Sequence, residues 1–227
     1  DLDIPAFKVG SGEITNSPLL KYIAQKDKPV ILSTGMSYLA EVDEAVRLIQ
    51  AAGNGQIILL HCVSNYPAKP EDINLRAMLT MANAFQVPVG YSDHTLGHAV
   101  ALAARALGAC LIEKHLTLDS TLPGPDQLAS LEPAEFKKMV SGIHDIEKAL
   151  GHGRKIPSAS EANTAKVARR SLIASSDIPA GTTLSTEMIA VKRPGDGIPP
   201  AMLPYIIGRT VLYPIEAGTV ITLELLA

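Results

Sequence analysis

The sequence predicts an α/β protein in which residues 1–150 form part of a (β/α)8 barrel and residues 168–227 form a small β-rich domain. Three observations lead to this prediction. Short apolar runs alternate with segments of helical periodicity along the first 150 residues. The apolar runs are continuous, which is typical of parallel strands that are covered on both faces. Polar residues gather where each run ends.

Five pairs of strand and helix are expected along the chain. The expected strands are residues 4–9, 29–33, 57–62, 87–91 and 110–114, and the helices that follow them are residues 18–25, 39–52, 75–85, 95–107 and 133–150. The strand at 57–62 is apolar throughout its first four residues. In the helix at 39–52, Val42, Val46 and Ile49 fall on one face, and Gly53 is placed to end it.

The polar residues at the strand ends favour a barrel over an open sheet. In nearly every unit such a group lies at the C-terminal end of the predicted strand: Lys8–Glu13, Ser33–Gly35, Ser64–Tyr66, Ser92–His94 and Glu113–His115. Loops of barrel enzymes converge on one mouth, whereas an open doubly wound sheet uses mainly its switch point. A whole barrel takes eight units in about 250 residues, so about three units are expected ahead of Asp1. We therefore expect the chain to be the later part of a longer protein.

The pattern changes after residue 150. Residues 151–160 are rich in Gly, Pro and Ser, so a linker is expected over residues 151–167. Beyond it, the segment Ala180–Met188 resembles the segment Ala217–Leu225. Two related halves with short β runs and many turns predict a compact domain over residues 168–227 with internal two-fold similarity.

The composition excludes several classes of protein. The 227 residues are 47% hydrophobic and 19% charged, which suits a globular chain with one good core. A net charge of -3 offers no basic surface for nucleic acid. Neither a membrane span of about 18 apolar residues nor a signal peptide is expected, so we expect a cytoplasmic protein. Cys62 and Cys110 end apolar runs and are expected to be buried thiols.

Two histidines are expected to meet at the ends of the last two strands. If Tyr91 faces the helices, alternation along the strand sends His94 to the barrel interior, and His115 shares that side. Neighbouring strands lie about 5 Å apart, so both imidazoles can reach one divalent ion, such as Mn, Mg, Co or Zn. The alternative is that each histidine only packs or forms hydrogen bonds in its loop. Lys114 and His61 have the opposite parity and are expected to be structural.

The residues at the other strand ends favour the binding of an anion. Lys8 supplies a positive charge, and hydroxyls are expected from Ser11, Ser33, Ser64 and Ser92. The turns at residues 10–12 and 34–35 expose backbone N–H groups, and this combination can hold a phosphate or a carboxylate. The alternative is that these glycines and serines only shape the turns.

Six stretches carry a family resemblance: FKVGSGE, PVILSTGM, LLHCVSNYP, VGYSDHTLG, IEKHLTLDSTLPGPD and VKRPGDG. In this order, and along essentially the whole chain, they resemble the sialic acid synthase family. Members of that family make nine-carbon 2-keto sugar acids from phosphoenolpyruvate and an N-acylated amino sugar. They join a (β/α)8 barrel to a small C-terminal SAF domain, which is similar to type III antifreeze proteins.

The resemblance implies a role for each matching residue. His94 and His115 would be the metal ligands, and Mn is the ion that we expect first. Phosphoenolpyruvate would be held by Lys8, Ser33, Ser64 and Ser92, with Ser11 beside them; some family members carry Asn at the Ser64 position. The amino sugar would contact Glu13, Tyr66 and Asp126, and it would be reached by Arg193 from the SAF domain of a neighbouring protomer in a domain-swapped homodimer.

The implied reaction suits these residues. The methylene carbon of phosphoenolpyruvate is a latent nucleophile, and an open-chain N-acylated hexosamine, such as N-acetylmannosamine or a diacetamido-trideoxyhexose, offers an aldehyde. A metal held by His94 and His115 would polarise that aldehyde, after which water adds and phosphate departs. Glu113 is a candidate for moving a proton or orienting a water, and the alternative is that it only anchors Lys8 as an ion pair.

Two other functions compete with this one. A metal-dependent class II aldolase or epimerase would use the same two histidines without releasing phosphate. A non-catalytic sugar-binding or ice-binding protein built around the C-terminal domain is the third. The loop VKRPGDG places Lys192, Arg193 and Asp196 together, which argues against the flat, weakly charged face that ice binding needs.

Overall fold

The computed structural model describes residues 3–227, so the first two residues of the predicted 1–150 domain lie outside the described part. The chain forms two compact units, one that ends at Gly153 and one that runs from Arg154 to Ala227. This boundary lies in the segment for which we expect a linker. None of the helices within residues 3–227 combines the length and the hydropathy of a membrane span.

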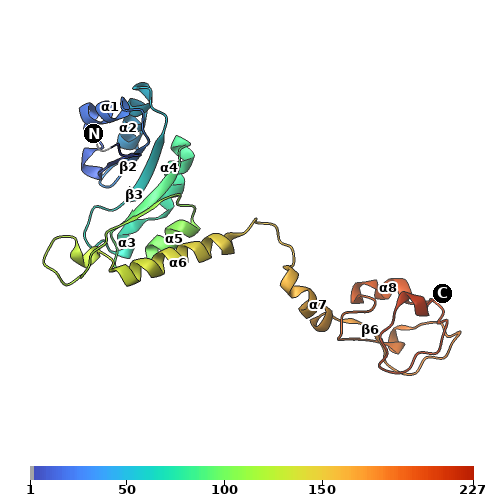
Figure 1. Ribbon diagram of the computed structural model, residues 1–227. Coiled ribbons are helices and arrows are strands. Elements are labelled where there is room, and N and C mark those ends of the chain that lie inside the picture. The colour runs from blue at the N-terminus through green and yellow to red at the C-terminus, as the bar shows by residue number, and fades with distance from the viewer. Residues whose placement is uncertain (1–2) are drawn as a thin grey trace. The chain divides into compact units, whose positions relative to one another are not determined.

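A parallel sheet of five strands forms the centre of the first unit (Figure 1). Its strands lie in sequence order: β1 (Phe7–Val9), β2 (Val30–Ser33), β3 (Ile57–Cys62), β4 (Val89–Asp93) and β5 (Ile112–Lys114). The helices of this unit are α1 (Ser17–Ala24), α2 (Leu39–Ala51), α3 (Pro70–Ile73), α4 (Arg76–Phe85), α5 (Ala99–Ala106) and α6 (Pro133–Leu150). The predicted α/β class with parallel strands is thereby confirmed.

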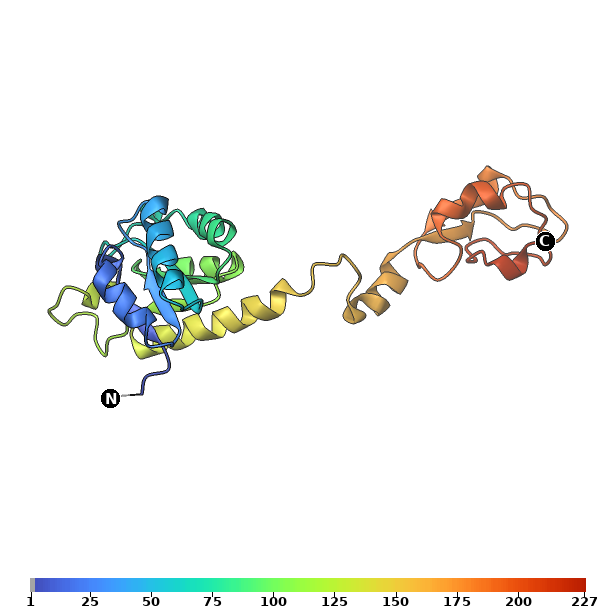
Figure 2. The same cartoon turned by 90° about the horizontal axis from the view of Figure 1, so that it is seen from above.

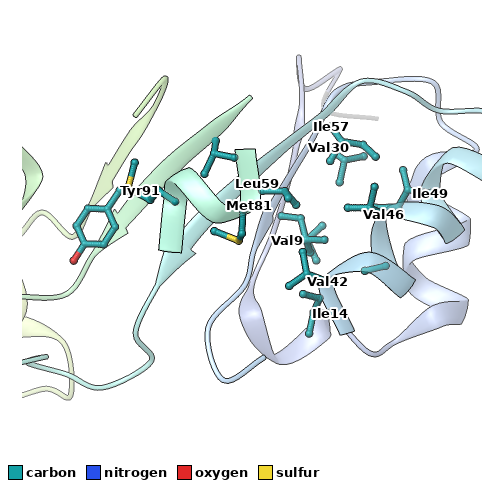
Figure 3. Close-up of a cluster of buried hydrophobic side chains, with 14 of the residues drawn as sticks. Val9, Ile14, Val30, Val42, Val46, Ile49, Ile57, Leu59, Met81 and Tyr91 are labelled. Carbon is teal, nitrogen blue, oxygen red and sulfur yellow. The ribbon is translucent and has the colours of Figure 1, made fainter. Parts of the chain in front are cut away.

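The main core lies between the sheet and its helices. Val42, Val46 and Ile49 follow the helical spacing that the sequence shows, and Figure 3 shows them directed from α2 toward strand residues such as Val30 and Ile57. All five side chains are buried. The long helix α6, yellow in Figures 1 and 2, packs against α5. The apolar face of each helix therefore fixes it to one side of the sheet.

The opposite side of the sheet carries the polar strand residues. Tyr91 is fully buried in the helix-side core, so the neighbouring Ser92 and its register partner Glu113 face the other way. Cys62, the register partner of Ser92 on β3, shares this side. Lys8 shares it as well, because Val9 lies in the core. We call the side that carries Lys8, Cys62, Ser92 and Glu113 the polar face.

Three expectations differ from the structure. The helix expected from Thr95 begins at Ala99, because residues 94–98 form a loop whose polar groups are held by neighbouring strands. The single turn α3 was not predicted, since only Ile73 of its four residues is buried and it shows no period. Cys110 is exposed rather than buried, because it precedes β5 instead of lying within the sheet.

The second unit is a small domain with little regular structure. Helix α7 (Ala162–Ala168) falls largely in the expected linker segment, and β6 (Ser171–Ala174) pairs antiparallel with β7 (Ile189–Lys192). A further short helix is α8 (Leu203–Ile206). Other strand-like pairings of this unit are isolated bridges, such as that between Ile178 and Ile215. The unit is less regular than a β-rich domain with continuous strands.

The two similar segments of the second unit adopt similar local structures. Each has a glycine with positive φ, 79° at Gly181 and 85° at Gly218, a conformation that costs glycine little. Each ends in a 3₁₀ turn, at Thr186–Met188 and at Leu223–Leu225. The repeat found in the sequence is thus a repeat of turn geometry.

Candidate active site

The imidazole rings of His94 and His115 lie beside each other, beyond the ends of β4 and β5. Their ring centres are 5.4 Å apart and the ring planes are inclined by 63°. The strand register explains this, because Asp93 and Lys114 are partners and the next residue on each strand is a histidine. The sequence prediction that these two side chains share one side of the sheet is consistent with this geometry.

One nitrogen of His94 is fixed by the backbone. Nδ1 lies 2.7 Å from the carbonyl oxygen of Val63, so it must carry the proton and donate it. The lone pair is then on Nε2, which lies 3.5 Å from Oγ of Ser92. Burial lowers the pKa of His94, against the bond to Val63, and the nearby His115 lowers it further. A neutral ring with a free Nε2 is the form that binds a metal.

Tyr66 and Asp126 complete the surroundings of the two rings. The Tyr66 ring centre lies 4.1 Å from that of His94 and 5.6 Å from that of His115. Oδ2 of Asp126 lies 3.9 Å from Nδ1 of His115. Burial, together with the charges of Cys62, Asp126 and Glu113, raises the pKa of Tyr66, so its phenol stays protonated at neutral pH. Tyr66 and Asp126 thus lie beside the two rings.

A chain of polar contacts links Lys8, Glu113 and Ser92 on the polar face. Ser92 donates a hydrogen bond of 2.7 Å to Oε1 of Glu113, and Nζ of Lys8 lies 3.4 Å from the same oxygen. The Lys8 and Glu113 side chains are about one third exposed, at 34% and 36%. The ion pair that we considered for Glu113 is therefore present. Its position beside Ser92 and the histidines also leaves the proton-transfer role open as a prediction.

The turn after β2 brings three strand ends into contact. The N–H of Gly35 donates to Oγ of Ser11 at 2.9 Å, and that oxygen lies 3.1 Å from Sγ of Cys62. A Cβ on Gly35 would come within 2.3 Å of Oγ of Ser64 and 2.8 Å of Oγ of Ser11. Glycine is required here because Ser11 and Ser64 occupy the space of a side chain.

Ser33 has a buried hydroxyl with no hydrogen-bond partner among the described residues. It lies on the polar face, since Val30 and Leu32 lie in the core. Buried polar groups nearly always have a partner, so a hydroxyl without one at the end of a strand is compatible with a partner that a ligand brings.

Two predicted residues are held elsewhere. Oε2 of Glu13 accepts a hydrogen bond of 2.7 Å from Asn16, in an exposed turn after β1. Arg193 belongs to the second unit, where its Nε donates to the carbonyl oxygen of Ala168 at 3.0 Å. The sugar contacts assigned to both residues remain predictions.

Sequence reasoning missed the role of Asp93. Its carboxylate forms an ion pair of 3.0 Å with Lys114, and both side chains are fully buried. Lys114 and His61 face the helices as predicted; Nε2 of His61 lies 2.6 Å from the carbonyl oxygen of Ile73. The strand alternation that places Lys114 on this side places Asp93 there too, and a charge inside an apolar strand was the signal that could have found it.

The side chains present fit a divalent ion in part. Among the described residues, no group of three or more His, Cys, Asp or Glu side chains is arranged to hold a metal. His94 and His115 supply two nitrogen donors from adjacent strand ends, and waters or a substrate oxygen would fill the other positions. Such a site, open to substrate, is the kind used in metal-assisted catalysis.

Known proteins that are similar to this chain match it along nearly its whole length. N,N'-diacetyllegionaminic acid synthase from Legionella pneumophila is 46% identical over 98% of this chain and 64% of the relative. Human N-acetylneuraminate-9-phosphate synthase is 37% identical over 99% of this chain and 63% of the relative. A crystal structure of N-acetylneuraminic acid synthetase from Leptospira borgpetersenii matches with a TM-score of 0.66 and 41% identity, over 71% of this chain and 56% of that one.

The chain thus spans less than two thirds of the length of these relatives. Its residues 169–227 match the SAF domain. Its residues 1–155 match the NeuB family over the whole of the first unit, including every strand of the sheet. The chain belongs to the NeuB family.

Proposed function

We infer that the whole protein condenses phosphoenolpyruvate with the open-chain form of an N-acylated hexosamine to give a nine-carbon 2-keto sugar acid and phosphate. The observation that carries this proposal is the approach of His94 and His115 beside the contacts of Lys8, Ser92 and Glu113. The names of the relatives from Legionella pneumophila and human, both sugar acid synthases, support the same class of reaction.

The polar face suits the binding of phosphoenolpyruvate. Lys8 offers an ammonium group on a side chain that is one third exposed, and hydroxyls come from Ser11, Ser33, Ser64 and Ser92. We assign the amino sugar to the region beside Tyr66 and Asp126, and we propose that Glu13 contacts it from the turn after β1. The sugar aldehyde would then lie next to the two imidazoles.

His94 and His115 would hold a divalent ion, for which Mn is our first choice. When bound there, the ion would polarise the aldehyde and stabilise the negative charge that develops on its oxygen. The protein's own part is to hold both rings at a fixed separation, with Nε2 of His94 unprotonated. The Tyr66 ring lies against the His94 ring, with 4.1 Å between the ring centres.

The reaction then forms a carbon–carbon bond and a bond from water to C2, and it breaks the bond from C2 to the phosphate oxygen. The methylene carbon of phosphoenolpyruvate joins the aldehyde carbon, whose oxygen takes up a proton. Water adds to C2 and gives up a proton, and the C2–O bond to phosphate breaks. Glu113, fixed by Ser92 and close to Lys8, is placed to accept the proton of that water.

Phosphate release in heavy-oxygen water tests this proposal. The whole protein, with Mn²⁺, phosphoenolpyruvate and a panel of mono- and diacetylated hexosamines, is expected to release phosphate only when a sugar is present. Because the C2–O bond breaks, the released phosphate should contain no oxygen from water. Heavy oxygen in the phosphate would show simple hydrolysis at phosphorus, and carbon–carbon bond formation without phosphate would indicate an aldolase; either result would refute the proposal.

We also propose that the five-stranded sheet is part of a closed eight-stranded barrel in the whole protein. Parallel strands in sequence order, with helices packed on one side and reactive side chains on the other, are the pattern of such barrels. The similarity to the Leptospira borgpetersenii synthetase supports this. Circular dichroism and a crystal structure of the whole protein would test it, and an open sheet there would contradict it.

Arg193 is proposed to act on the active site of a second protomer in a domain-swapped homodimer. Its planar guanidinium suits sugar hydroxyls or a carboxylate. Two inactive variants of the whole protein, Arg193→Ala and His115→Ala, should then regain part of the activity when they are mixed and allowed to exchange protomers, because one site in the hybrid dimer has both groups intact. Phosphate release measures this, and unchanged inactivity in a verified hybrid would contradict action in trans.

Gly35→Ala is expected to weaken phosphoenolpyruvate binding. The added methyl group would push against the hydroxyls of Ser11 and Ser64, and overpacking of this kind costs about 1–3 kcal/mol. We expect the KM for phosphoenolpyruvate to rise about tenfold, which corresponds to about 1.4 kcal/mol. Gly55→Ala is the matched control, since a Cβ there meets nothing within 4 Å. Equal KM values for the two variants would contradict the assignment.

A further inference from the structure

A buried polar network lies directly behind the two histidines. Nζ of Lys114 is 3.0 Å from Oδ2 of Asp93, and neither side chain has any exposed surface. Oδ1 of Asp93 accepts three hydrogen bonds: from the Tyr91 hydroxyl at 3.2 Å, from the Thr95 N–H at 2.9 Å and from the Thr95 hydroxyl at 2.8 Å. Lys114 also donates to the carbonyl oxygen of Thr95. Every oxygen of the carboxylate is therefore used.

The Asp93–Lys114 pair lies at the end of the two strands, next to the histidines in sequence. Asp93 and Lys114 are register partners and are the last residues of β4 and β5. One position before them, Ser92 and Glu113 are joined on the polar face. One position after them come His94 and His115. Because side chains alternate, the ion pair lies on the helix side of the sheet, between two pairs of residues that point to the polar face.

The network begins where the register pairing between β4 and β5 ends, at Asp93 and Lys114. Both backbone groups of Thr95, the residue after His94, are held by it: the N–H by Asp93 and the carbonyl by Lys114. The carbonyl of His94 itself accepts a bond of 2.9 Å from Ala68. The backbone that follows His94 is thus fixed by two side chains that also tie β4 to β5.

A gain in folding stability does not by itself explain why a buried ion pair lies at this position. Removing two charges from water is costly, and apolar residues of the same size are often equally stabilising in their place. What an ion pair with fully used acceptors supplies is a fixed geometry. Here the geometry that it fixes is the separation of two strand ends, each of which carries an imidazole at its next residue.

We propose that the Asp93–Lys114 pair is a positioning device that sets the distance and direction between the His94 and His115 rings, so that both nitrogens meet one divalent cation. The inference rests on the proposed function only in that the two rings share such a cation. Neither Asp93 nor Lys114 touches the cation or a substrate. They act through Thr95 and through the register of the two strands.

The test compares Mn²⁺ binding by neutral variants of the whole protein. In the double variant Asp93→Asn/Lys114→Met both charges are removed and the side-chain volumes are nearly kept. A matched control is Arg105→Met/Glu147→Gln, which removes an ion pair of 3.2 Å between α5 and α6. Mn²⁺ affinity is read from the electron paramagnetic resonance signal of the free ion, and folding from cooperative thermal unfolding.

We expect the Asp93/Lys114 variant to melt cooperatively but to bind Mn²⁺ at least about tenfold more weakly, in line with the 10–100-fold effect of residues that orient metal ligands. The control should bind as the wild type does. Thr95→Val removes only the hydroxyl bond to Asp93, so it should weaken Mn²⁺ binding about threefold, a small part of the same effect. If the double variant does not fold, the Mn²⁺ affinity of Thr95→Val tests the inference in its place.

Unchanged Mn²⁺ affinity in these folded variants, with a loss only of melting temperature, would reduce the pair to a structural role and overturn the inference. Failure of the wild type to bind Mn²⁺ would instead overturn the metal site of the proposed function, and the positioning inference with it. The wild-type titration therefore separates the two failures.

Discussion

His115→Ala in the whole protein is expected to lower kcat/KM for phosphate release by about a thousandfold. The variant removes one of the two imidazoles that face the proposed aldehyde position, and loss of one preorganised group that stabilises developing charge costs about 10²–10³ in rate. His115 is the better choice for this test because its side chain is 34% exposed, whereas His94 also ties Val63 to its strand end. Steady-state phosphate release measures the effect.

A matched control excludes a general effect of losing a histidine. His144 lies on α6 with its side chain 63% exposed, so His144→Ala should keep wild-type activity and melting temperature. If His115→Ala retained more than about a tenth of the wild-type rate, the loss would be far below the 10²–10³ expected of such a group. The two rings would then share no catalytic task.

Glu113→Gln is expected to lower kcat by about a hundredfold, because a positioned acid or base contributes about 10²–10⁴. The amide keeps the size of the side chain and an oxygen that can accept the bond from Ser92, so the strand ends should stay in place. The charge, which is needed to take up a proton, is lost. Measurements of kcat and of the KM for phosphoenolpyruvate separate the two roles considered for Glu113.

If Glu113 only anchored Lys8, the variant would behave differently. Removal of a carboxylate that lies 3.4 Å from Lys8 would free the ammonium and lower the repulsion of an anion, so the KM for phosphoenolpyruvate would fall while kcat stayed constant. Glu44→Gln, an exposed position on α2, is the control and should change neither value. A constant kcat with Glu113→Gln would show that the proton-transfer role is wrong.

The helices and strands of the first unit were largely predictable from their apolar spacing. Residues 57–62 and 133–150 were predicted with the bounds that β3 and α6 have, because a fully apolar strand and an amphipathic helix leave few alternatives. Residues 95–98, which belong to a loop, were predicted as helix. Their backbone groups bind to side chains such as Asp93 and Lys114 instead, and no local pattern reveals that.

In the second unit, the sequence repeat predicted the turns but not the length of the strands. The similarity of Ala180–Met188 to Ala217–Leu225 predicted two related halves, and both segments do contain a positive-φ glycine and a final 3₁₀ turn. The amount of regular strand was overestimated. The pairing partners of these segments, such as Thr183 with Thr210, meet at single bridges, and the length of a ladder depends on residues far apart in the sequence.

The site was predictable where strand alternation applies. Alternation alone places Ser92, His94, Glu113 and His115 on one side, and the structure has them in contact or adjacent there. The crowding around Gly35 was not predictable, because it depends on how three separate loops approach one another. Nor was the buried Asp93–Lys114 pair recognised as a unit: Lys114 was predicted to face the helices, but Asp93 was counted only with the polar group at the end of its strand.

Pulsed electron paramagnetic resonance of Mn²⁺ bound to the whole protein tests the central claim most directly. The account predicts couplings from two imidazole nitrogens in the wild type and from only one in His115→Ala, because the His94 and His115 rings, 5.4 Å apart, hold the same ion. Wild-type protein with saturating Mn²⁺ that shows no nitrogen coupling, or the same single coupling before and after the substitution, would contradict a shared ion at these two strand ends.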